Sequence, residues 1–140
     1  MATPAVKVTA INHVVLHVSD LDVSMRFYLD VLGFEVRGTN SDPERRMRFL
    51  RCGAQGLDLF EVASDVHGGE EMNHMAVNCE ADDLDEVVSA LESVGIDASA
   101  RTNRGSVFIL DPDGHRIEML PKNSMERQRE RAAAGAVGAS

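Results

Sequence analysis

Basic residues are scarce in this chain of 140 residues, in which 14 lysines and arginines stand against 23 aspartates and glutamates. The net charge of −9 argues against nucleic acid and anionic membrane surfaces as partners, because both attract basic patches. No apolar run approaches the roughly 20 residues that span a bilayer. The opening MATPAVKVTA also lacks the charged segment and long apolar stretch of a signal peptide. We therefore expect a cytoplasmic location.

Cysteine is also rare, and the two present, Cys52 and Cys79, lack the spacing of a metal-binding motif. They are typical of small buried residues in a reducing compartment, although the sequence leaves a disulfide between them open. Hydrophobic residues make up 44% and charged residues 26% of the chain, as in ordinary globular proteins. The length suits one domain with a sizeable core.

An internal repeat organises the chain. The runs INHVVLH and MNHMAVN both contain an Asn-His step inside an apolar stretch, and their histidines, His13 and His74, lie 61 residues apart. Each run alternates like a strand and precedes an Asp-Leu-Asp step, after which apolar residues recur at helical spacing. Ser19 or Asp20 can cap the first helix, and Asp82 or Asp83 the second. Gly33 and Gly95 are suited to end the helices in a left-handed conformation.

Further strands close each half of the repeat. They are FEVRG, RMRFLRCG and GLDLFEVA in the first half, and IDASA, GSVFIL and HRIEML in the second, where DPDG forms a turn. The chain is therefore predicted to be an α+β protein of two tandem βαβββ modules. We assign one domain to residues 8–122, with modules at about 8–64 and 71–122, and a solvated helix from Ser124 to about Ala134 with a frayed tail to residue 140.

Side-chain alternation places the polar residues of these strands on one face. The residues that should lie under the helices are Val14, Leu16, Val18, Leu57, Leu59, Met75, Val77, Cys79, Ile117 and Met119. His13, Asp58, His74 and Glu118 then share the opposite, concave face, and the repeat relates Asp58 to Glu118 as it relates the histidines. Two imidazoles and two carboxylates need compensation in a cleft, which one divalent ion supplies. Such mixed ligands suit Zn, Mn, Ni, Co or Fe.

These residues and motifs make the chain resemble the vicinal-oxygen-chelate superfamily, which holds glyoxalase I, fosfomycin-resistance enzymes, extradiol dioxygenases and bleomycin-binding proteins. The resemblance covers about Val8 to Leu120 and is carried by INHVVLHVSDLDVSMRFYLDVLGFEV, MNHMAVNCEADDLDEVVSALESVGI and FILDPDGHRIEML. It implies cup-shaped sheets around a central pocket, a metal at the junction of the modules on His13, Asp58, His74 and Glu118, and a homodimer.

The sequence departs from parts of this family. His17 stands where glutathione-dependent glyoxalases commonly carry an arginine. Asp58 replaces the usual Glu or Gln and is one methylene shorter. Alternation places Glu61 off the concave face, and because it lies at the end of its strand it is expected to be solvated. A strand bulge could instead bring it to the metal in place of Asp58. Tyr28 is expected in the core, which leaves Phe108 where a dioxygenase would use a tyrosine. His115, which follows the DPDG turn, is expected at the surface.

Substrate contacts are expected from side chains that share the concave face or flank it. His17, Asn78 and Arg116 lie on that face, Phe60 is suited to an apolar wall, and Arg104 to an anionic group. The set of expected substrate-binding residues is His17, Phe60, Asn78, Arg104, Phe108 and Arg116.

Three functions follow as hypotheses. The first is a divalent-metal-dependent isomerase or lyase of the glyoxalase type, acting on a small substrate through a metal-stabilised enediolate, with Asp58 or Glu118 as general base. The second is an extradiol-type ring-cleavage dioxygenase with Fe(II) on His13, His74 and Glu118. The third is a metal-free protein that binds a small molecule such as an antibiotic.

Overall fold

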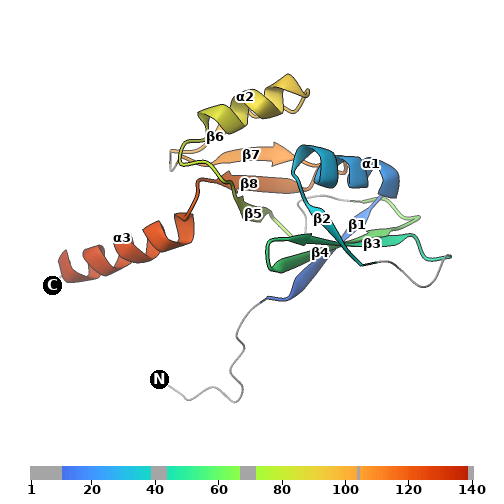
Figure 1. Ribbon diagram of the computed structural model, residues 1–140, viewed down its shortest axis with the longest axis horizontal. Coiled ribbons are helices and arrows are strands. Elements are labelled where there is room, and N and C mark those ends of the chain that lie inside the picture. Colours follow the sequence, from blue (N-terminus) through green and yellow to red (C-terminus); the bar gives the residue numbers. More distant parts are fainter. Residues whose placement is uncertain (1–10, 39–43, 67–71, 104, 139–140) are drawn as a thin grey trace, which may run out of the picture. The chain divides into compact units, whose positions relative to one another are not determined.

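The computed structural model describes residues 11–38, 44–66, 72–103 and 105–138 (Figure 1). The chain divides after Val66 into two compact units, each built around its own four-stranded sheet. Each unit contains the same order of elements, a strand, a helix and three strands. The prediction of an α+β fold with two βαβββ modules is therefore confirmed.

The first unit forms a mixed sheet in the order β1-β4-β3-β2. Its first strand pairs in parallel with its last, and the remaining neighbours are antiparallel. The helical segment continues from a short α-helix into a π-helical turn. The elements are β1 (His13–Val18), α1 (Leu21–Arg26), η1 (Phe27–Val31), β2 (Glu35–Gly38), β3 (Met47–Cys52) and β4 (Gln55–Glu61).

The second unit repeats this topology in the order β5-β8-β7-β6, again with a parallel pair between its first and last strands. Its first strand begins only at Met75, so His74 stands immediately before it. The strand expected over IDASA is reduced to two residues. The elements are β5 (Met75–Asn78), α2 (Asp85–Ser93), β6 (Ala100–Arg101), β7 (Val107–Leu110), β8 (Arg116–Leu120) and α3 (Ser124–Gly138).

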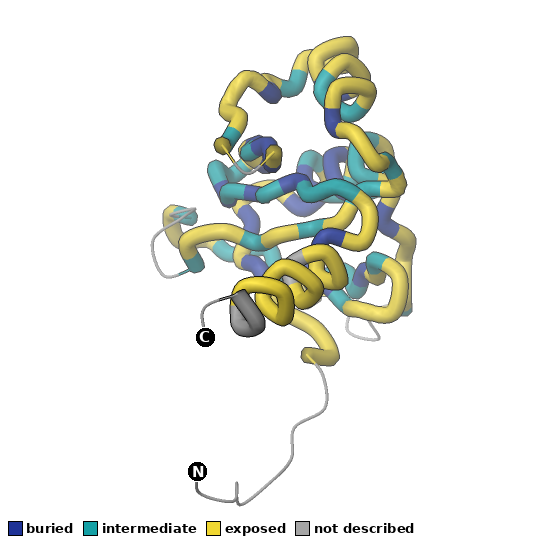
Figure 2. The backbone as a smooth tube through the Cα atoms, turned by 90° about the vertical axis from the view of Figure 1, so that its left-hand side faces the viewer, coloured by how far each residue is buried: buried dark blue, intermediate teal, exposed yellow. Residues whose placement is uncertain are grey.

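Burial follows the predicted alternation of faces in part (Figure 2). Of the residues expected under the helices, Leu16, Val18, Leu57, Leu59, Ile117 and Met119 are buried. Met75, Val77 and Cys79 are only half-buried, and Val14 is 37% exposed, so their expected burial was wrong. Tyr28 is fully buried against Phe27 and Phe34, as predicted. Because the apolar residues hold one face of each sheet in the core, the alternating polar residues are directed to the other face.

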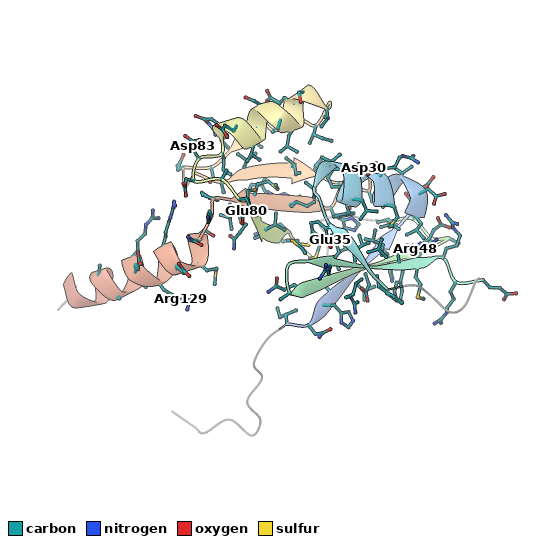
Figure 3. All side chains as sticks on the ribbon, in the orientation of Figure 1. Asp30, Glu35, Arg48, Glu80, Asp83 and Arg129 are labelled. Atoms are coloured by element: carbon teal, nitrogen blue, oxygen red, sulfur yellow. The ribbon has the colours of Figure 1, made fainter. Side chains whose placement is uncertain are left out.

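The helix ends use most of the expected signals. Asp20 caps α1 by accepting a hydrogen bond from the Val23 amide at 3.1 Å. Gly33 and Gly95 both have positive φ, at 75° and 84°, which only glycine adopts without strain. At the second helix Asp83, labelled in Figure 3, accepts from the Asp85 amide at 2.7 Å, although the cap position itself is Leu84.

The C-terminal helix begins at Ser124 as predicted but runs on to Gly138, four residues beyond the expected end at Ala134. The alanine-rich stretch after Arg131 favours helix strongly enough to carry it through Gly135. Ser124 is buried, whereas the described side chains that follow it are exposed (Figure 2). No helix in the described parts of the chain is long and apolar enough to cross a membrane.

The DPDG turn is closed by a buried hydrogen-bonded pair, Asp111 and His115, that the sequence did not indicate. His115 is only 7% exposed, so its expected surface position was wrong. Its Nδ1 lies 2.8 Å from an Asp111 carboxylate oxygen, and its amide donates to the other oxygen of Asp111 at 2.8 Å. The hydrogen bond to Asp111 raises the pKa of His115, against the opposing effect of burial.

This pair makes stability depend on pH. A histidine whose pKa is raised on folding stabilises the folded state fully below its unfolded pKa, here 6.5, and loses that contribution as pH rises through the folded value. Urea unfolding across about pH 5 to 8 should therefore show the free energy of unfolding falling with pH. His115→Asn keeps a donor near the Nδ1 position but does not titrate, so it should flatten this slope. An unchanged slope in that variant would contradict the assignment.

Candidate functional site

The first and last strands of the first unit bring His13 and Asp58 together. In the parallel β1–β4 ladder Val15 is the Cα partner of Asp58, and His13 is that of Gly56. The His13 Nε2 atom lies 3.8 Å from an Asp58 carboxylate oxygen. The Asp58 carboxylate is buried while the imidazole is half exposed. Two of the four residues expected on the concave face therefore lie close together within the first unit.

Arg37 of β2 also engages Asp58, and sequence reasoning missed it. Its guanidinium donates to the other Asp58 oxygen at 2.5 Å and to the Leu50 carbonyl at 3.4 Å, and it lies over the Phe49 ring. A buried carboxylate needs such a partner to offset its loss of contact with water. On the same strand Glu35, labelled in Figure 3, pairs with Arg51 at 2.6 Å.

Gly56 allows the close approach of His13. A Cβ atom added to Gly56 would lie 2.7 Å from the His13 Cβ and 3.3 Å from the Arg37 Nε. Real Cβ atoms essentially never come that close to another carbon. The glycine therefore leaves room for both partners of Asp58, His13 and Arg37.

The second unit places His74 and Glu118 in the corresponding arrangement. Ala76 is the Cα partner of Glu118, and the His74 Nε2 atom lies 3.3 Å from a Glu118 carboxylate oxygen. The His74 ring meets Phe108 edge to face at a centroid distance of 5.3 Å. The Arg116 guanidinium lies over the same phenylalanine, 4.6 Å from the ring centroid.

The two clusters are repeats of one arrangement. In each cluster the carboxylate residue pairs, across the parallel ladder, with the residue two positions after the histidine. On its other side the carboxylate residue pairs with a phenylalanine of the antiparallel neighbouring strand. In each, an arginine covers the phenylalanine. We call them the first half-site (His13, Asp58, Phe49, Arg37) and the second half-site (His74, Glu118, Phe108, Arg116).

An asparagine side chain holds each histidine. The Nδ1 atom of His13 lies 2.8 Å from the Asn12 side-chain oxygen, and that of His74 lies 2.8 Å from the Asn73 side-chain oxygen. The repeated Asn-His step in the sequence signalled these contacts. Such partners orient a ligand histidine and leave its other nitrogen available.

The other expected contact residues are dispersed. His17 is exposed on β1, where Phe60, which is half-buried, is its Cα partner. Asn78 accepts a hydrogen bond from the Ser124 hydroxyl at 2.8 Å, so its side chain ties β5 to the start of α3. Arg104 lies outside the described residues. Phe108 and Arg116 stand in the second half-site, beside a surface groove of about 410 Å³.

Glu61 has a structural role instead of the solvated position expected of it. One of its carboxylate oxygens accepts from the Leu21 amide at the start of α1 at 2.8 Å, and the other accepts from Arg46 at 2.9 Å. The Leu21 amide and, after it, Arg46 lower the pKa of Glu61. Both oxygens are thus engaged at the end of a helix, away from the face that carries Asp58.

Each half-site offers an imidazole nitrogen and a carboxylate oxygen to a metal. Ligands about 2.1 Å from one ion are about 3 to 3.4 Å apart for octahedral or tetrahedral angles. The separation of 3.3 Å in the second half-site fits this range, and 3.8 Å in the first needs a small adjustment. No group of three or more metal-binding side chains occurs within the described ranges, because each unit brings two such residues together. The donor types in the half-sites suit a divalent ion.

Comparison with known proteins identifies the family. The profile of the Glyoxalase/Bleomycin resistance protein/Dioxygenase superfamily matches residues 10–119, which include both half-sites. The lactoylglutathione lyase of Haemophilus influenzae is 29% identical over 128 residues, which span 81% of this chain and 93% of that protein.

Solved structures show the same fold. The lactoylglutathione lyase of Agrobacterium tumefaciens is 28% identical with a TM-score of 0.60, and the match covers 84% of this chain and 96% of that one. A mutant of the fosfomycin resistance protein FosX of Listeria monocytogenes, complexed with Mn(II) and 1S,2S-dihydroxypropylphosphonic acid, has a TM-score of 0.71 at 19% identity. That match covers 87% of this chain and 99% of the other, and at this identity it shows the fold alone.

The contrast between Asp58 and Glu61 yields a test of the ligand set. Asp58→Ala removes a donor from the first half-site and should weaken divalent-metal binding by about 10- to 100-fold or more, as measured by calorimetry. Glu61→Ala should leave metal binding near the wild-type value and lower the melting temperature, because α1 loses a hydrogen-bond acceptor at its start. The reverse pattern would show that Glu61 is the ligand.

Proposed function

Because the chain belongs to the Glyoxalase/Bleomycin resistance protein/Dioxygenase superfamily, we propose that it is a divalent-metal-dependent isomerase or lyase of the glyoxalase type. Its substrate is a small molecule that presents two adjacent oxygens. The observation that carries this proposal is the repeated pair of imidazole and carboxylate, His13 with Asp58 and His74 with Glu118. The similarity to a protein named lactoylglutathione lyase supports the reaction class.

The proposed ligands are His13, Asp58, His74 and Glu118, two from each half-site, and they share one ion. Zn, Mn, Ni, Co and Fe all accept such mixed ligands. With these four side chains as ligands, the ion would still have room for a bidentate substrate. When bound, the ion supplies Lewis-acid stabilisation of negative charge on the substrate oxygens.

The two carboxylates differ in a way that favours Glu118 as the proton carrier. Asp58 is buried and its second oxygen is held by Arg37, which fixes the carboxylate in place. The Glu118 side chain is one methylene longer than that of Asp58 and is 21% exposed. One of its carboxylate oxygens lies near the His74 Nε2 atom. A general base must change its protonation state and reach the substrate carbon, which suits the less constrained carboxylate. Asp58 then acts chiefly as a ligand.

Substrate contacts in this proposal come from residues around the half-sites. Phe60 and Phe108 supply apolar surface, and His17 and Arg116 supply hydrogen-bond donors. Asn78 is the weakest member of the expected set, because its side-chain oxygen already accepts from Ser124. We further propose a homodimer, since β1 and β5 are edge strands of their sheets and exposed strand edges favour pairing.

Metal binding is the first test. The purified chain, stripped with chelator and titrated in turn with Zn, Mn, Ni, Co and Fe(II), should bind about one ion per chain of at least one of them. His74→Ala should abolish binding, because it removes one of the two imidazole ligands, whereas Asp58 is the shorter of the two carboxylates and its loss should cost less. A lack of stoichiometric binding for every ion would refute the proposal.

Proton transfer is the second test. The metal-loaded protein should catalyse solvent-deuterium exchange at the carbon next to an oxygen in 2-oxo or hydroxy-acid candidates. Glu118→Gln should slow this exchange by about 100-fold or more, because the general base is lost. Glu92→Gln, the same change on an exposed position of α2, serves as the control.

A parallel arm loads the protein with Fe(II) without oxygen and then adds oxygen with a panel of catechols. Oxygen uptake with the colour of ring-cleavage products, together with no deuterium exchange, would replace the proposal by dioxygenase chemistry.

A further inference from the structure

We infer that Asn12 and Asn73 are positioning residues that fix the tautomer and orientation of His13 and His74, so that both Nε2 atoms present a lone pair to the metal. This inference rests on the proposed function, because it assigns a role within the same site. It is carried by contacts that occur in both half-sites, at the same ring nitrogen and at the same distance of 2.8 Å.

The chemistry of the contact determines the direction of the hydrogen bond. The side-chain oxygen of asparagine only accepts hydrogen bonds, so the Nδ1 atom that faces it must carry the proton. A neutral imidazole has one N–H, which leaves Nε2 with a free lone pair. The carboxylates compete for that proton from the other side of the ring. Their distances to Nε2, 3.8 Å for Asp58 and 3.3 Å for Glu118, are longer than the 2.8 Å contacts to asparagine.

Arg116 fixes which atom of the Asn73 amide faces the histidine. Oxygen and nitrogen of an amide are assigned from their neighbours, and an arginine side chain carries donors only. The Arg116 Nη1 atom lies 3.4 Å from the Asn73 oxygen, which also faces His74. An amide turned the other way would direct its N–H group at the guanidinium. The Asn73 side-chain oxygen thus accepts hydrogen bonds from two donors, the Arg116 guanidinium and the His74 Nδ1–H group.

Asn12 is held through its backbone. Its carbonyl accepts from the Gly56 amide at 2.9 Å, which fixes the residue at the start of the parallel β1–β4 pair. The missing side chain of Gly56 leaves room for the His13 Cβ at the same place. Gly56 and Arg116 occupy equivalent positions of the repeat, since each lies two residues before the carboxylate of its half-site. One half-site therefore fixes the asparagine through its backbone, and the other through its side chain.

The tautomer can be read directly in the metal-free protein. Long-range ¹H–¹⁵N spectra distinguish Nδ1–H from Nε2–H imidazoles, and they are recorded above about pH 8, where ordinary imidazoles are neutral. Resonances of His13 and His74 are assigned with His→Gln variants. The wild-type chain should show the Nδ1–H form at both residues. Asn12→Ala and Asn73→Ala should each shift the adjacent histidine toward Nε2–H, which its carboxylate favours.

Metal affinity gives the second readout. Zn or Mn titration should show affinity reduced by about 10-fold in each Asn→Ala variant, as is typical when a group that orients a ligand is lost. Asn12→Asp and Asn73→Asp keep the accepting oxygen and should restore both the Nδ1–H signature and the affinity. Asn103→Ala makes the same change in an exposed turn and should alter neither. Melting temperatures confirm that each variant is folded.

The outcomes separate this inference from the proposed function. Asn→Ala variants that keep the Nδ1–H form, or that lose it without any change in metal affinity, would overturn the positioning role while the metal site stands. Failure of the wild-type chain to bind any ion would overturn the proposed function, and with it the positioning of a metal ligand. In that case the spectra still show whether the asparagines hold the rings.

Discussion

The parallel pairing of the first and last strand in each unit is the constraint on which both half-sites depend. It places a histidine at the start of one strand, or immediately before it, diagonally beside the carboxylate of the other strand, with the same register in both units. A slip of one residue would turn every side chain of a strand to the opposite face. The buried residues Leu16 and Leu57 in the first unit, and Ile117 in the second, hold that register, because they would lose their place in the core. The core therefore fixes the spacing of the polar groups.

This dependence explains why alternation in the sequence predicted so much of the site. The apolar residues of each strand identify the covered face, and the remaining positions follow from the period of two. His13, Asp58, His74 and Glu118 were all placed on the uncovered face by this reasoning, and the structure pairs them within each unit. How the two pairs combine stays a prediction, because local periodicity carries no information about the packing of one module against another.

Other contacts depend on features that alternation does not contain. Arg37 reaches Asp58 from β2, whose register with β3 shifts between Val36 and Gly38. A bulge of this kind re-aims a side chain by an amount that the sequence pattern does not show. Glu61 was expected in solvent because strand alternation places it off the face that carries Asp58. Alternation does not show that the first amide of α1, at Leu21, lies close enough to donate a hydrogen bond to Glu61. The surface position expected for His115 was wrong for a similar reason. The DPDG turn brings the His115 side chain back to Asp111, the first residue of the turn, and alternation along a strand does not show this contact.

The repeat has diverged at the groups that support each histidine and carboxylate. The first half-site clamps a short, buried aspartate with an arginine from β2, whereas the second holds a longer glutamate whose neighbouring arginine contacts Asn73 and Phe108. The same residue type thus supports a carboxylate in one unit and the partner of an imidazole in the other. In the proposed function, the fixed carboxylate serves as a metal ligand and the less constrained one exchanges a proton. Under that proposal, divergence between the two halves of the repeat is a physical route from a symmetric ligand set to an asymmetric acid–base site.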